Sequence, residues 1–252
     1  MLRTNYLRQK LSNGDCTLGT WNIIPSPFVV DIIASAGLDF IIIDSEYGSM
    51  SFETAQTMVA VCESYGVSPI MRVGKLDESL VLKALDIGMH GIQIPNVSSV
   101  DDARLLVNYA KYPPQGQRGF SPYVRAGLYN VENGPILPHK GNENTLVIVN
   151  LEGPDSLSNI EEIASVNGID IIFIGVFDLS KTLGVPGEIQ HPKVMESLDA
   201  AISKVHKIGK KVGTIASNKS MFKILKSKRV DYLTYSVDSG VLREGYTKLL
   251  KE

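Results

Sequence analysis

The sequence predicts a single (β/α)8 barrel of the α/β class, and three observations predict it. Short β-branched runs alternate with longer helical runs about eight times along the chain. The β-branched runs are apolar throughout, which is typical of parallel strands covered on both faces. The chain has 252 residues, close to the roughly 250 that such a barrel needs. No break in composition divides the chain, so we expect one domain over residues 1–252.

The first half of the chain supplies four strand–helix units, and cap residues mark several helix ends. Ser51 with Thr54 fits a helix start, as does Asp77, while Gly37 and Gly88 fit helix ends. The expected strands are 17–24, 39–45, 68–73 and 91–97, and the helices that follow them are 27–37, 51–66, 77–88 and 99–112.

A long segment without a clear pattern, residues 113–144, separates the two halves. It is too long for a simple connection, so we expect a lid or a substrate loop. The alternation then resumes. The expected strands are 145–152, 169–180, 210–217 and 230–237, and the expected helices are 156–166, 192–209, 220–229 and 241–252.

A doubly wound open sheet is the alternative architecture for the same alternation. Such sheets often carry a glycine-rich dinucleotide-binding turn after their first strand. No such turn follows residues 17–24 here, so the closed barrel is favoured.

Composition narrows the range of partners and compartments. The formal net charge is -2 and basic residues form no stripe, so we expect no nucleic-acid partner. No apolar run reaches the roughly 18 residues of a membrane span, and no signal peptide is recognisable, so we expect no membrane partner. Cys16 and Cys62 form no disulfide framework, which favours a reducing cytoplasm.

Polar side chains follow most of the expected strands, where the active site of a barrel is built. Strand by strand, these residues are Asp44, Glu46 and Tyr47, then Arg72, then Gln93 and Asn96, then Asn150 and Glu152, then Gly175 and Asp178, then Thr214 and Ser217. A lone acid at a strand end is usually a structural cap. Two acids at consecutive strand ends, Glu152 and Asp178, can instead converge on one cation because neighbouring strands lie about 4.8 Å apart.

Carboxylates with water and substrate oxygens suit Mg²⁺ or Mn²⁺, and the lack of clustered His and Cys argues against structural zinc. Arg72 could bind a carboxylate or stabilise an enolate oxygen. Its alternative role is an ion pair with Asp44 or Glu46.

Several motifs occur in an order that resembles a known family. They are "GTW", "AGLDFIIIDSEYG", "IMRVG", "LKALDIGMHGIQIPNVSSVDDA", "YPPQGQRGFSPYVRA", "NLEG" and "GIDIIFIGVFDLS", and they span nearly the whole chain. Together they resemble the HpcH/HpaI family of class II pyruvate-dependent aldolases, which cleave 4-hydroxy-2-oxo acids.

The resemblance implies a barrel of the phosphoenolpyruvate/pyruvate type whose last helix is exchanged with a neighbouring subunit, in a hexamer or trimer. It also implies a divalent metal that chelates the 2-oxo acid, Mg²⁺ or Mn²⁺ with Co²⁺ as a further option. Glu152 and Asp178 match the metal ligands, and Arg72 matches the arginine that stabilises the enolate. The backbone around Gly175 to Asp178 matches the cradle for the pyruvate carboxylate. Asp86 matches the aspartate that orients a catalytic histidine.

The sequence departs from the family pattern at four positions near the expected site. Tyr47 stands where the family has the histidine base, and a phenol with an ordinary pKa near 10 is a poor base at neutral pH. Asn150 replaces a glutamine, and Val176 and Phe177 replace smaller residues before Asp178. These changes alter the expected substrate pocket.

Three functions are compatible with these residues. The first is a metal-dependent aldolase acting on 4-hydroxy-2-oxo acids, with Arg72 and Tyr47 as catalytic residues. Its variant is a C–C bond-forming synthase of the citrate-forming siderophore type, in which Tyr47 donates a hydrogen bond to the new alkoxide. The second is a 2-oxo-acid binder that has lost cleavage. The third is an enzyme acting on a phosphorylated substrate, with Arg118 and Arg125 as the candidate phosphate ligands. We expect these two arginines to bind the distal carboxylate of a longer substrate, or to close a subunit interface.

Overall fold

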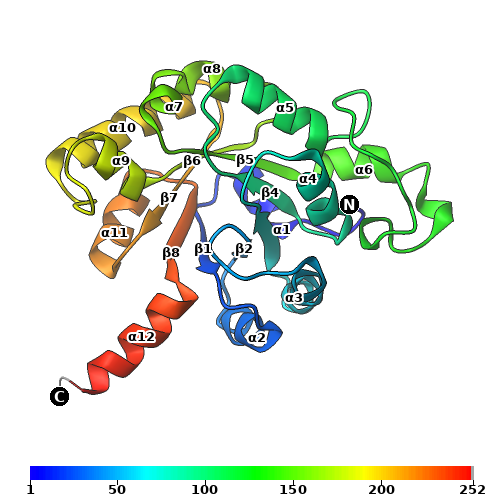
Figure 1. Ribbon diagram of the computed structural model, residues 1–252, viewed down its shortest axis with the longest axis horizontal. Helices are drawn as coiled ribbons and strands as arrows, with labels where there is room; N and C mark the ends of the chain where they lie inside the picture. The colour runs from blue at the N-terminus through cyan, green and yellow to red at the C-terminus, as the bar shows by residue number, and fades with distance from the viewer. Residues whose placement is uncertain (251–252) are drawn as a thin grey trace.

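Eight parallel strands close into a barrel in the order in which they occur along the chain (Figure 1). The structure is a computed structural model that describes residues 1–250. Strand β1 pairs with both β2 and β8, which closes the barrel and confirms the predicted fold. The strands are β1 (Thr17–Asn22), β2 (Phe40–Asp44), β3 (Ser68–Arg72), β4 (Gly91–Ile94), β5 (Leu146–Leu151), β6 (Ile171–Ile174), β7 (Lys211–Ala216) and β8 (Tyr232–Val237).

Helices follow each of the strands, and most of them pack around the barrel, while α12 extends away from it. They are α1 (Tyr6–Ser12), α2 (Pro27–Ser35), α3 (Phe52–Ser64), α4 (Glu78–Asp86), α5 (Val100–Ala110), η1 (Arg125–Gly127), η2 (Val131–Asn133), α6 (Leu137–Asn144), α7 (Pro154–Ser158), α8 (Ile160–Ala164), α9 (Val176–Thr182), α10 (Pro192–Lys207), α11 (Lys219–Ser227) and α12 (Asp238–Leu249). None of the helices in residues 1–250 combines the length and apolar character needed to cross a bilayer.

Local sequence signals explain where several helices begin and end. The Ser51 side chain accepts a hydrogen bond from the backbone of Thr54, and Asp77 caps α4 in the same way. Gly37 and Gly88 follow α2 and α4 with positive φ angles of 84° and 95°, a conformation that glycine adopts without strain.

Apolar side chains fill two layers, one inside the barrel and one between the barrel and the helices. In β2, Phe40 and Ile42 belong to the inner layer, whereas Ile41 and Ile43 pack in the outer layer. The Phe40 ring stacks on Tyr232 with ring centroids 4.0 Å apart. A Cβ at position 19 would overlap the Phe40 ring, so this contact requires glycine in β1. The strands are apolar throughout because both of their faces are buried.

The long segment is partly helical and lies at the end of the barrel where the strands begin. It contains η1, η2 and α6. It connects the end of α5 to the start of β5, and Asn144 at its end accepts a hydrogen bond from Asn5 beneath the barrel. The expected lid or substrate loop therefore lies at the amino end of the chain's own barrel and not over its mouth, because the segment follows a helix and precedes a strand.

Three further differences affect the predicted elements. The expected helix 156–166 is two short helices, α7 and α8. The expected strand 169–180 ends at Ile174, and α9 begins at Val176, so Asp178 lies in the first turn of a helix. Helix α1 was not predicted from the sequence; it covers the amino end of the barrel and places Leu7 and Leu11 against the inner layer.

Candidate active site

A cavity of about 460 Å³ opens at the carboxyl ends of the strands. Its size is in the range of small-molecule sites. It is lined by Trp21, Ile23, Asp44, Tyr47, Arg72, Asn150, Glu152, Phe173, Gly175, Val176, Phe177, Asp178, Ile215 and Val237. Most of the residues predicted from the strand ends are therefore brought together in one cavity.

Arg72 is held rigidly by two neighbouring acids. Asp44 and Arg72 are paired residues of β2 and β3. Arg72 donates from Nε to Asp44 Oδ1 at 2.9 Å and from Nη2 to Oδ2 at 2.6 Å, and Nη1 lies 3.1 Å from Glu46 Oε2. The Trp21 ring covers the guanidinium at 4.2 Å, and the Tyr47 ring lies 4.9 Å away. The predicted alternative, an ion pair, is thus present with both acids, and it orients the remaining N–H donors.

A chain of hydrogen bonds positions Glu152. Gln93 Nε2 donates to Asn150 Oδ1 at 2.7 Å, and Asn150 Nδ2 donates to Glu152 Oε1 at 2.9 Å. Burial raises the pKa of Glu152, and the nearby charge of Asp178 raises it further, although the Asn150 hydrogen bond lowers it. Asn150, which lies in the wall of the barrel, therefore fixes the position of the Glu152 carboxylate and favours its ionised form.

Glu152 and Asp178 flank Gly175, which keeps the space between them open. A Cβ at position 175 would lie 3.1 Å from Glu152 Cγ and 3.6 Å from Asp178 Oδ2. Asp178 makes no side-chain hydrogen bond within residues 1–250. No group of three or more His, Cys, Asp or Glu side chains in the described chain has metal-binding geometry. Two carboxylates fit Mg²⁺ or Mn²⁺, which commonly keep waters and substrate oxygens as their other ligands.

Glu46 and Tyr47 respond to this concentration of negative charge. Burial raises the pKa of Glu46, and Glu152, Asp44 and Asp178 raise it further, against the opposing effect of Arg72. The charge of Glu46 is the main cause of a raised pKa at Tyr47. The Tyr47 phenol therefore stays protonated at neutral pH, as a hydrogen-bond donor.

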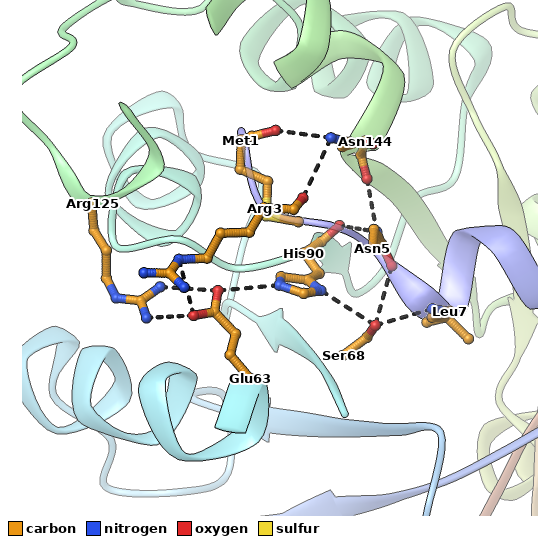
Figure 2. Close-up of polar contacts among 9 residues, drawn as sticks. All are labelled: Met1, Arg3, Asn5, Leu7, Glu63, Ser68, His90, Arg125 and Asn144. Atoms are coloured by element: carbon orange, nitrogen blue, oxygen red, sulfur yellow. Dashed lines mark hydrogen bonds and ion pairs between the residues drawn. The ribbon is translucent and has the colours of Figure 1, made fainter. Parts of the chain in front are cut away.

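The structure does not bring Asp86, Arg118 and Arg125 to the mouth of their own barrel. Asp86 ends α4 at the opposite end, where it accepts a hydrogen bond from Arg118 Nη2 at 2.7 Å. Arg125 donates to both oxygens of Glu63 at 3.1 and 2.6 Å (Figure 2). Within one chain, Asp86 cannot orient Tyr47 and neither arginine reaches the cavity, because all three lie where strands begin.

Thr214 is also absent from the cavity lining. Its side chain is fully buried in β7, and its hydroxyl donates to the Ile174 carbonyl at 2.8 Å. The expected substrate contact is replaced by a contact within the barrel wall.

The apolar part of the cavity was not predicted. It consists of Trp21, Ile23, Phe173, Ile215 and Val237. Trp21 lies near the end of β1, where the same strand-end rule could have found it. Phe173 and Ile215 are interior strand residues whose contribution depends on the barrel geometry.

The model of the HpcH/HpaI aldolase/citrate lyase family matches residues 18–232. The chain belongs to this family. It is accordingly a carbon–carbon lyase of the class II aldolase type, and enzymes of this family use a divalent metal.

Three relatives illustrate the range of the family. A pyruvate aldolase of Rhizobium etli is 29% identical over 244 residues, which cover 97% of this chain and 95% of the relative. A 4-hydroxy-2-oxo-heptane-1,7-dioate aldolase of Salmonella dublin is 31% identical over 242 residues, 96% of this chain and 91% of the relative. The crystal structure of citrate synthase SbnG superposes with a TM-score of 0.89 at 27% identity and covers 98% of this chain and 97% of that chain.

Proposed function

We propose that the chain catalyses the reversible aldol addition of pyruvate to a carbonyl acceptor, forming or cleaving a 4-hydroxy-2-oxo acid. The observation that carries the proposal is one cavity in which Arg72, fixed by Asp44, faces the carboxylate pair of Glu152 and Asp178. The aldolase relatives support the same chemistry.

Each side chain has a defined task in this proposal. Glu152 and Asp178 would hold Mg²⁺ or Mn²⁺, which when bound supplies Lewis-acid polarisation of the 2-oxo group. Arg72 has five N–H donors; two of them donate to Asp44, and Nη1 forms an ion pair with Glu46. The donors that Asp44 does not use would bind substrate oxygen. Backbone N–H groups from Gly175 to Asp178 would bind the pyruvate carboxylate. Asn150 keeps Glu152 in place.

Tyr47 supports the bond-forming direction as a second candidate. Its pKa is raised by Glu46, so it can donate a hydrogen bond to a developing alkoxide but is a weak base for the hydroxyl of a cleavage substrate. The likeness to citrate synthase SbnG is consistent with a synthase. A citrate-forming reaction is therefore the alternative within the same site.

The test is turnover with Mg²⁺ or Mn²⁺ in both directions, comparing the wild type with Tyr47→His. We expect slow cleavage of 4-hydroxy-2-oxo acids by the wild type and at least about tenfold faster cleavage by the variant. If neither protein cleaves these acids or makes product from pyruvate or oxaloacetate, the proposal fails. A metal-dependent rise in melting temperature with oxalate, in the absence of any turnover, would instead support a 2-oxo-acid binder.

A homo-oligomer is part of this proposal. Helix α12 extends away from the barrel (Figure 1), and Val241, Leu242, Tyr246 and Leu249 are exposed on it. Phe28 and Ile32 on α2 are 82% and 69% exposed. Apolar side chains at such exposure favour burial against another subunit, consistent with an exchanged last helix. Light scattering of the wild type and of a variant ending at Val237 tests this, with a lower mass expected for the variant.

A further inference from the structure

The charge of the cavity restricts which acceptor can bind beside pyruvate. Four carboxylates lie at the mouth of the barrel: Asp44 and Glu46 pair with Arg72, and Glu152 and Asp178 line the same cavity as Arg72. When all are ionised, the mouth carries three surplus negative charges. A divalent cation leaves one of these, and the pyruvate carboxylate adds another. An acceptor with its own carboxylate therefore meets net repulsion.

No free cation compensates for this charge. Within residues 1–250, Arg72 is the single cationic side chain in the cavity lining, and it already pairs with two acids. The two loop arginines that the sequence offered for a distal carboxylate are engaged elsewhere. The Arg118 side chain is 1% exposed and pairs with Asp86, while Arg125 pairs with Glu63 beside His90 (Figure 2).

Part of the cavity wall is apolar. Ile23, Phe173, Val176, Ile215 and Val237 line it. Phe177 lies at its rim and is half exposed, as the first-turn neighbour of Asp178 in α9. Ile23, Ile215 and Val237 are partly exposed, so burying them and Phe177 against an apolar group displaces water and is favourable. A carboxylate placed there would lose its hydration without an ionic partner.

We propose that the acceptor of this enzyme is an uncharged aldehyde with an apolar or aromatic substituent, and that Phe177 contributes to this selectivity. This inference rests on the proposed aldol function. In the reaction, C3 of pyruvate loses a proton and bonds to the aldehyde carbon, and the aldehyde oxygen gains a proton. Atoms and electrons balance without an oxidant or reductant. The proposed acceptor differs from that of the relatives named 4-hydroxy-2-oxo-heptane-1,7-dioate aldolase. The dioate in their name carries a second carboxylate, which comes from the aldehyde acceptor.

The experiment measures kcat/KM for matched acceptor pairs with pyruvate and Mg²⁺ or Mn²⁺. The pairs are butanal with succinic semialdehyde, and benzaldehyde with 4-carboxybenzaldehyde. We expect the uncharged member of each pair to react at least about tenfold more efficiently. A preference for the carboxylated members would overturn the inference, including the case in which a neighbouring subunit supplies the missing cation.

Phe177→Arg tests the role of this side chain by gain of function. We expect the variant to raise the efficiency with succinic semialdehyde relative to butanal by about tenfold or more, because the new guanidinium supplies an ionic partner. Phe177→Leu is the matched control and should keep the preference for butanal. An unchanged ratio in Phe177→Arg would exclude Phe177 as a selectivity residue.

Exchange of the pyruvate methyl protons with solvent deuterium, followed by NMR, separates the two proposals. It needs no acceptor and reports enolate formation alone. Failure of exchange in the wild type contradicts the aldol function. Exchange combined with a preference for carboxylated acceptors contradicts only the acceptor inference.

Discussion

At the amino end of the barrel, the Glu63 carboxylate is bound by Arg125, Arg3 and His90 (Figure 2). At the mouth, Arg72 pairs with Asp44 and Glu46, while Glu152 and Asp178 form no ion pair within residues 1–250. Burial raises the pKa of Glu63, but hydrogen bonds from His90 and Arg125 outweigh it and the net pKa is lowered. Burial also raises the pKa of Glu152, and there the nearby Asp178 adds to it. The Glu63 carboxylate thus finds its cationic partners within the protein, whereas the Glu152 carboxylate has none there and can bind a ligand cation.

Hydrogen bonds around His90 at this amino end also hold the first residues of the chain in place. Asn5 Nδ2 donates to the carbonyls of His90 and Asn144 at 2.9 and 2.7 Å, and Ser68 Oγ accepts from the Leu7 backbone at 3.1 Å. The polar groups there are nearly all used within the chain, as expected for a structural network.

Glu152→Gln should reduce activity by about 10³-fold or more, since several kcal/mol of transition-state stabilisation depend on the metal site. Its melting temperature without metal should stay equal or rise, because burial disfavours the ionised carboxylate that is removed. Turnover and calorimetry in a chelator check this. A large drop in melting temperature would mean that Glu152 is structural.

Glu63→Gln should have the opposite effect and lower the free energy of unfolding by about 3 kcal/mol. The variant leaves the buried Arg125 guanidinium, which is 8% exposed, without its carboxylate. Denaturant unfolding measures the change. Deuterium exchange into pyruvate should continue in the folded variant, and its loss would link the amino end to the chemistry.

The pH dependence of stability should distinguish the ends in the metal-free protein. The pKa of Glu63 is lowered in the folded state, and burial lowers that of His90 against its bond to Glu63. Each group therefore contributes to the stability of the folded state above its unfolded-state pKa, which is about 6.5 for His90 and about 4.3 for Glu63. These contributions to stability are lost as the pH falls below those values.

Glu46 and Glu152 have raised pKa values, so their protonation stabilises the folded state as pH falls. Between about pH 6.5 and 4, Glu152→Gln should therefore lose stability more steeply than the wild type. Thermal unfolding of the two proteins across this range measures the slopes, and parallel curves would contradict the prediction.

The smallest effect should come from helix α5, away from both ends. Ser99 and Asp102 form a capping box, with Ser99 Oγ accepting from the Asp102 backbone at 3.1 Å. Ser99→Ala should cost about 1 kcal/mol of unfolding free energy without changing turnover. Arg104→Ala, which removes an exposed ion pair with Asp101, should cost at most about 0.5 kcal/mol.

The sequence predicted more of the fold than of the site. Uniformly apolar runs such as Phe40–Asp44 identify buried parallel strands, because both of their faces are covered. Strand ends also indicated Arg72, Asn150, Glu152 and Asp178, since consecutive parallel strands deliver their last residues to one edge. The order of the motifs indicated the HpcH/HpaI family.

Residues outside strand ends could not be placed in this way. Asp86, Arg118 and Arg125 fit the expected chemistry by type, but each follows a strand by a helix and lies at the amino end. A local pattern contains no information about which end of the barrel a connecting segment occupies once that segment forms its own helices.

By itself, the sequence determined the barrel, its closure by eight units and the acids at its mouth, because these depend on local periodicity and on strand polarity. Only the tertiary structure decided how the charges are partnered. At the mouth, Arg72 is the single cation beside four carboxylates and pairs with two of them, whereas Glu63 receives two arginines and a histidine beneath the barrel. The pairing of charges depends on distances of a few ångströms between distant segments, and only the closed barrel fixes those distances.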